Sequence, residues 1–135
     1  MIDILNLESV ILTLLKTDLP SSLFAKYPNL KLTTSDHRYT QASFPTVYLH
    51  MLPSEELGGF LSGTAINGVR ATFDIEVSSN RNLLESREIA NHIIMILKQN
   101  GFSIMHLPYS QQKHSAYYSI IRARRVFGIN DKSPI

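Results

Sequence analysis

The sequence predicts a single α+β domain over residues 1–135, with a mostly antiparallel or mixed β-sheet and two main helices packed on one face. Residues 69–77 alternate between apolar and polar side chains, as expected of a strand with one buried face. Residues 83–97 carry apolar side chains at helical spacing, and so do residues 4–15. A chain of 135 residues is long enough to form one hydrophobic core.

The first helix is expected over residues 3–17, with Asp3 as its cap. Its apolar side chains recur every three or four residues, which is typical of a helix buried along one stripe. Pro20 ends this helix, and the segment before Pro28 has room for one further helical turn. The apolar stripe comprises Ile4, Leu7, Ile11, Leu14 and Leu15.

A strand is expected over residues 46–52, opened by Phe44 and Pro45 and ended by Pro53. Both of its faces are fairly apolar, so the strand is either central in the sheet or turns one face toward another subunit. The polar stretch before it, residues 33–43, is a loop or an irregular edge strand.

Residues 53–68 are expected to form a long, glycine-rich β-hairpin arm between two antiparallel strands. The connection is longer than an ordinary hairpin loop, and such loops are often functional. Its apolar residues Leu57, Phe60 and Leu61 favour an arm that becomes ordered on a partner. The alternative is a mobile loop that lies over its own core. The glycines of the arm are Gly58, Gly59, Gly63 and Gly68.

A strand, a turn and a helix follow in residues 68–101, the clearest folding unit of the chain. Asn82 and Glu85 fit a capping box at the start of the helix. Asn100 and Gly101 fit a helix stop. The unit is expected to fold as a strand with a helix lying back over it.

Two more strands are expected, a short one over residues 102–107 and a last one over residues 116–129, joined by a polar connection. The last strand places Arg122 and Arg124 on one face. If it lies beside the strand 69–77, these arginines can pair with the carboxylates of that strand, Asp74 and Glu76.

No motif in the sequence predicts catalysis or a cofactor. The chain has no cysteine, and none of its five histidines has the spacing of a metal motif. The glycine-rich arm lacks the phosphate-binding patterns, and no nucleophile, base and orienting group stand together. The net charge is only +2, and the four residues 122–125 would split their charges between two strand faces, which disfavours nucleic-acid binding. The N-terminal segment is predicted to be neither a signal peptide nor a membrane span.

Four segments together resemble the small tail terminator, tail completion or tail-to-head joining proteins of long-tailed bacteriophages. The resemblance covers most of the chain from residue 44 to residue 130. The segments are FPTVYLHMLPSEELGG at residues 44–59, VRATFDIEVSSN at 69–80, LLESREIANHIIMILKQNGF at 83–102 and YYSIIRARRVFGIN at 117–130.

The resemblance implies a structural protein of the virion, present in the host cytoplasm during assembly, with no enzymatic activity and no cofactor. Such proteins form a ring, expected to be a homohexamer, that caps the tail tube, stops its polymerisation and presents a surface to the head connector. Expected partners are other copies of the chain, the major tail tube protein and neck proteins, without a membrane or sequence-specific nucleic acid. The arm and the arginine strand supply the candidate interface residues, which are Glu55, Glu56, Leu57, Phe60, Leu61, Arg122 and Arg124.

Two alternatives remain open from the sequence. The first is a neck, head-completion or minor tail protein of the same kind of virion. The second is a small α+β domain of a bacterial cell that binds a small molecule or nucleic acid. A ring would use heterologous contacts, in which one patch meets a different patch on the next copy.

Overall fold

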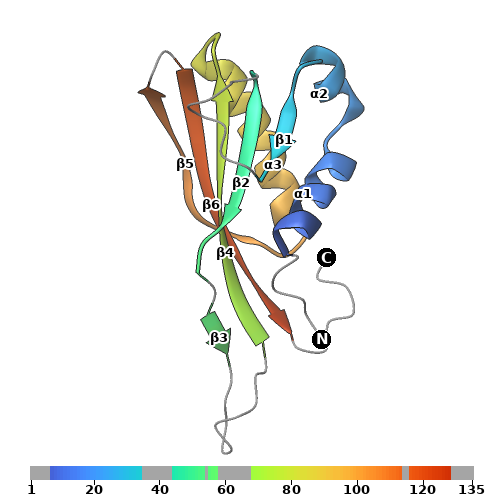
Figure 1. Ribbon diagram of the computed structural model, residues 1–135, viewed down its shortest axis with the longest axis vertical. Coiled ribbons are helices and arrows are strands. Elements are labelled where there is room, and N and C mark those ends of the chain that lie inside the picture. Colours follow the sequence, from blue (N-terminus) through green and yellow to red (C-terminus); the bar gives the residue numbers. More distant parts are fainter. Residues whose placement is uncertain (1–6, 35–43, 54, 58–67, 114–115, 129–135) are drawn as a thin grey trace, which may run out of the picture.

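The computed structural model describes residues 7–34, 44–53, 55–57, 68–113 and 116–128. Within them, a six-stranded mixed sheet carries α-helices on one face (Figure 1). The fold is therefore the small α+β domain that the sequence predicts.

The sheet has the strand order β1-β2-β4-β6-β5, and β3 pairs with the start of β4. Strand β1 runs parallel to β2, and every other pairing is antiparallel. The sheet is thus mixed but mainly antiparallel. The elements in chain order are α1 Leu7–Asp18, α2 Ser21–Lys26, β1 Lys31–Thr33, β2 Thr46–Met51, β3 Glu55–Leu57, β4 Gly68–Ser79, α3 Leu83–Gln99, β5 Ser103–Lys113 and β6 Ala116–Gly128.

Strands β4 and β6 form the centre of the sheet and pair along the whole of β4. The alternation predicted for β4 is confirmed, because one set of its side chains is buried and the other is partly exposed. The buried set consists of Val69, Ala71, Phe73, Ile75 and Val77.

The helices cover one face of this sheet (Figure 1). Helix α3 packs on β4, β5 and β6, whereas α1 packs on β1, β2 and α3. Three aromatic rings meet edge-to-face in the core: Phe102 lies 6.1 Å from Phe73 and 6.2 Å from Phe127, measured between ring centroids. Edge-to-face packing places the positive edge of one ring against the negative face of the next. The three rings fill the core next to the C-terminal end of α3.

Both ends of α3 are fixed by the residues that the sequence indicates. The Asn82 side chain accepts a hydrogen bond of 2.9 Å from the backbone N–H of Glu85. At the other end, Gly101 has a φ of 84°, and the backbone N–H of Phe102 donates to the carbonyl of Leu97. Together with the bond from Gly101 to Lys98, this forms a Schellman motif, which requires the left-handed conformation that glycine adopts without strain.

The first described residue, Leu7, already lies in helix α1, and the predicted helix start with the cap Asp3 lies outside the described residues. The structure corrects two other sequence-based predictions. Strand β5 continues to Lys113, so the segment after Pro108 is strand and not a polar connection. Proline is tolerated there because β5 is an edge strand with register shifts on both sides of His106. The short strand β1 was not predicted, and it lies mostly before the polar stretch 33–43.

Candidate functional site

Those predicted interface residues that the structure describes lie on two neighbouring parts of the sheet. Glu55 and Leu57 delimit strand β3, with Glu56 between them, and this strand pairs with residues 68–70 of β4. The hairpin predicted for the arm is confirmed at this base. Phe60 and Leu61 lie outside the described residues.

Arg122, on β6, binds the carboxylate of Asp74 on the neighbouring strand β4. Its Nε lies 2.7 Å from Asp74 Oδ1 and its Nη2 lies 3.0 Å from Oδ2, so the pair is bidentate. The two residues are direct cross-strand neighbours, as the sequence predicts. The side chain of Asp74 is only 16% exposed, so the pair should contribute about 1 kcal/mol, the upper end of the range for surface ion pairs.

On the open face of the sheet, the line of cross-strand neighbours that joins Arg122 and Asp74 continues onto β2. His50 pairs with Asp74 across the strands, and its ring stacks on that of Tyr48, with centroids 5.1 Å apart. The Nδ1 atom of His50 is buried and has no hydrogen-bond partner in the described part of the chain. The face opposite the helices therefore carries aromatic, charged and apolar side chains, most of them partly exposed.

An open cleft of about 350 Å³ lies where β6 runs past the first residue of β5. Arg70 and Arg124 reach it from the open side of the sheet, since both alternate with buried residues of their strands. Ser103 pairs with Arg124 across β5 and β6 and also lines the cleft. Three arginines, counting Arg125, line this single cleft, which makes it suited to anionic groups.

Arg125 approaches the cleft from the helix-covered side. Its guanidinium lies 4.8 Å from the centroid of the Phe127 ring, a cation–π distance. It also passes close to Gly101, where a β-carbon would come within 3.6 Å of its Nε. The positive charge thus lies near the carbonyl end of α3, which favours cations.

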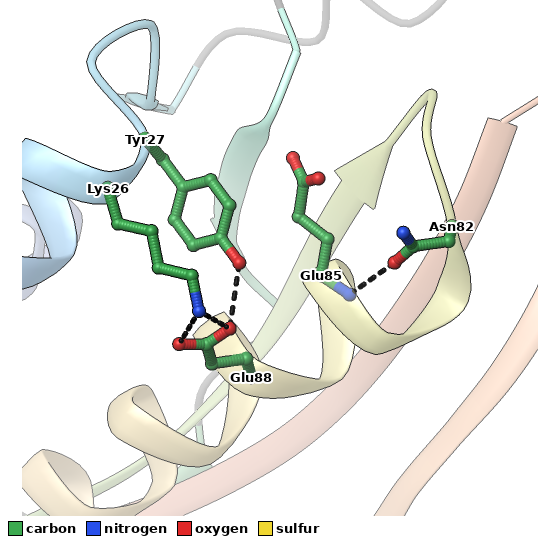
Figure 2. A network of polar contacts seen from close by, with 5 residues as sticks. All are labelled: Lys26, Tyr27, Asn82, Glu85 and Glu88. Carbon is green, nitrogen blue, oxygen red and sulfur yellow. Dashed lines mark hydrogen bonds and ion pairs between the residues drawn. The ribbon is translucent and has the colours of Figure 1, made fainter.

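A second cleft, of about 500 Å³, lies between α2 and the start of α3. Here the Nζ of Lys26 lies 2.9 Å from both carboxylate oxygens of Glu88, and the Tyr27 hydroxyl donates to Glu88 Oε2 at 2.7 Å (Figure 2). The residues are about 60 positions apart in sequence, so the network fastens α2 to α3.

These contacts change the acidity of the three groups. The hydrogen bonds from Lys26 and then from Tyr27 lower the pKa of Glu88 below its ordinary 4.5. The hydrogen bond to Glu88 raises the pKa of Lys26. Burial, followed by the hydrogen bond to Glu88, raises the pKa of Tyr27 above 10.0.

Sequence reasoning located the arginine strand but missed both clefts. Arg70 could have been added from the alternation of β4, because it lies on the same face as Asp74. The alternation of β6 places Arg125 on the opposite face from Arg124, so the strand pattern does not predict that it lines the same cleft. Nothing in the sequence pairs Lys26 or Tyr27 with Glu88, because that contact depends on how α2 packs on α3.

Within the ranges that the structure describes, no group of three or more His, Asp or Glu side chains comes together in a way that could hold a metal ion. Over the same ranges, no helix has the length and hydrophobicity needed to cross a membrane. No protein-family model matches the chain, and a search of curated protein sequences finds no match.

Proposed function

We propose that this protein is a structural subunit of a long-tailed bacteriophage, a tail terminator that forms a ring on the end of the tail tube. The observation that carries the proposal is the sheet face opposite the helices. Among the described residues the helices cover one face, and the other face leads into the β3–β4 hairpin at the end of the sheet (Figure 1). A subunit with a partly exposed sheet face of this kind is suited to burial against other subunits.

The ring would be closed by contacts between two different patches on successive copies. The first patch is the hairpin, which carries Glu55 and Glu56 in β3. The second is the arginine cleft, which Arg124 lines, whereas Arg122 lies outside this cleft and binds Asp74 within the subunit. Acidic and basic patches of this kind would steer the copies into register. The role requires no reaction and no cofactor.

Two other functions fit parts of the same surface. A neck, head-completion or minor tail protein would use the open face in a related assembly. A small α+β binding domain from a bacterial cell would use the arginine cleft for a small anion, since guanidinium groups match carboxylate and phosphate.

Assembly with the tail tube protein tests the proposal. The chain is co-expressed with the major tail tube protein of the same phage, and the products are measured by native mass spectrometry and electron microscopy. A tail terminator should give a ring on the tube end, with six times the 15.3 kDa subunit mass for the expected hexamer. A chain that stays monomeric beside assembled tubes and is absent from virions would contradict the role.

Two variants test whether the hairpin and the arginine cleft take part in assembly. Deletion of residues 56–62 should leave a folded domain that fails to end tube growth, so that tails become longer. Arg124→Glu should prevent ring formation by reversing a charge of the cleft, while Lys16→Glu on the exposed side of α1 makes the same charge change and should assemble normally. Normal tail length and head joining with the deletion would exclude the arm from this function.

A further inference from the structure

The arginine cleft at the start of β5 has three cationic side chains and, among the described residues that line it, no acidic one. The cleft between α2 and α3 differs, because two carboxylates line it together with two cations. Positive charge that the lining itself does not balance suits the arginine cleft to an anion from outside. Its described lining consists of Arg70, Arg124, Arg125, Gly101, Ser103 and Val126.

Arg124 supplies positive charge without an acidic neighbour on the adjacent strands. It faces the open side of the sheet, and its cross-strand neighbours are Thr72 on β4 and Ser103 on β5, both uncharged. Arg122, two residues away on the same face, has Asp74 as its neighbour and binds it. Within the part of the chain that the structure describes, no ion pair or hydrogen bond is made by the Arg124 guanidinium. Its charge is therefore available to a ligand in the cleft.

Arg70 and Arg125 bring two more guanidinium groups to the cleft from different sides. Arg70 lies beside Val126 on the open face, and its neighbour on the other side is Glu55 of β3. Arg125 comes from the helix-covered side, where it lies over the Phe127 ring. A guanidinium has five N–H donors, so an arginine that has a partner within the subunit still has donors for a ligand. The three groups thus present N–H donors to one shared space.

This set of donors favours a phosphate group over a carboxylate. A carboxylate has one charge on two oxygens, which the fork of a single guanidinium already matches. A phosphate monoester has nearly two negative charges and three strong acceptor oxygens, so it can accept hydrogen bonds from several guanidinium groups at once. The Ser103 hydroxyl, which also lines the cleft, can donate to one of these oxygens. Val126 is 50% exposed on the same cleft and offers an apolar contact to the group that the phosphate esterifies.

We infer that the arginine cleft binds a phosphate dianion, free or as a monoester, through the guanidinium groups of Arg124, Arg70 and Arg125, with the Ser103 hydroxyl as a further donor. The inference goes beyond the tail terminator role and does not rest on it, because the ligand would bind the single subunit. In a ring, a bound phosphate would compete with the next copy for Arg124.

Titration of the whole protein with methyl phosphate tests the site, at constant ionic strength and at a pH of about 8, where the monoester is a dianion. The amide ¹H and ¹⁵N shifts of Gly101, Ser103 and Arg124 report binding. We expect saturable shifts with a Kd on the order of 1 mM. Acetate and dimethyl phosphate carry a single charge, and each should bind roughly 5-fold more weakly or less tightly still. Dimethyl phosphate also stands for the phosphodiester of nucleic acids.

Inorganic phosphate, titrated in parallel, identifies the source of the dianion. Binding of inorganic phosphate that is as tight as that of methyl phosphate, or tighter, assigns the site to the free ion. Tighter binding of methyl phosphate assigns it to a phosphorylated molecule whose attached group contacts Val126.

Three variants separate binding at the cleft from general attraction to a basic protein. Arg124→Gln should weaken binding by roughly 10-fold, because charge-assisted hydrogen bonds are lost. Ser103→Ala, at an exposed position, should weaken it by roughly 3-fold. Arg81→Gln removes one positive charge at the opposite end of α3 and is the matched control, which should bind as the natural protein does.

Several results would overturn the inference. They are the absence of saturation at roughly 50 mM methyl phosphate, where a millimolar site would be full, and binding of acetate or dimethyl phosphate as tight as that of methyl phosphate. Unchanged binding by Arg124→Gln, or an equal loss in Arg124→Gln and Arg81→Gln, would also overturn it. If Arg124→Gln does not fold, unchanged binding by Ser103→Ala has the same consequence.

Discussion

Two serine hydroxyls join α3 to β6 inside the core. Ser86 and Ser119 are fully buried, with 3.0 Å between their Oγ atoms. Ser86 Oγ also donates to the carbonyl of Leu83 at 2.9 Å. A hydroxyl has one proton, so both contacts are satisfied only if Ser119 donates to Ser86.

This direction predicts unequal effects of the two alanine variants. Ser86→Ala leaves the buried Ser119 donor without its acceptor and should lower the free energy of unfolding by about 1–3 kcal/mol. Ser119→Ala leaves the Ser86 hydroxyl donating to the carbonyl of Leu83 and should lower the free energy of unfolding by less than about 1 kcal/mol. Chemical denaturation of the two variants and the double variant measures this, and a larger loss for Ser119→Ala would reverse the assigned direction.

The Glu88 network predicts an acid-sensitive contribution to stability. Because the pKa of Glu88 is lowered in the folded state, its contribution is present above the ordinary value of 4.5 and is lost as pH falls below that value through the lowered pKa. Glu88→Gln should therefore destabilise the protein more at a pH of about 6 than at about 3. Lys26 and Tyr27 act in the opposite range, since their raised pKa values contribute stability that is lost at alkaline pH.

Denaturation curves of Glu88→Gln and the natural protein at both pH values check the prediction. Glu8→Gln, outside the network, serves as the control and should show no such difference. Equal destabilisation by Glu88→Gln at both pH values would mean that the network adds no pH-dependent stability.

At the scale of the elements, the end of α3 depends on one glycine. Gly101→Ala would place a β-carbon at a φ of 84°, which should lower the free energy of unfolding by about 1 kcal/mol. The space is adequate, because the nearest atom would be 3.6 Å away, so the loss is conformational and not steric. Asparagine tolerates this conformation better than alanine does, so Gly101→Asn should be less destabilising than Gly101→Ala. Thermal unfolding of the two variants and the natural protein measures the difference.

The sequence predicts those elements whose patterns are local. The alternation of β4, the apolar stripe of α3 and the Asn82 and Gly101 signals all act within a few residues, and the structure confirms them. The ion pair between Asp74 and Arg122 was also predictable, because both strands alternate and lie side by side.

The elements that the sequence missed depend on distant partners. Strand β1 has only three residues and exists because Leu32 pairs with Val47 and is buried under the helices. The second half of β5 is polar and follows Pro108, so only its pairing with β6 makes it a strand. The cleft between α2 and the start of α3 was missed for the same reason, since it is formed by the packing of α2 on α3.

For the whole molecule, the centre of the sheet should be the most stable part. Amide hydrogens of Phe73, Ile75 and Ile121 lie in long paired strands beneath α3 and should exchange only on global unfolding. Strand β1 is a three-residue edge, and its amides should be less protected, by on the order of 100-fold. Hydrogen exchange followed by NMR measures both, and equal protection would indicate that the sheet opens only as a unit.

The lengths of β4 and α3 have a mechanical consequence. The 12 residues of β4 extend about 40 Å, whereas the 17 residues of α3 extend about 25 Å. The end of β4 that carries β3 therefore projects beyond the helix layer (Figure 1). A pull on this end along the strand would load the perpendicular hydrogen bonds between β4 and β6 in shear, so that many bonds resist at once. The β3–β4 hairpin is thus attached directly to the longest strand pairing of the sheet, β4 with β6, which should resist such a pull.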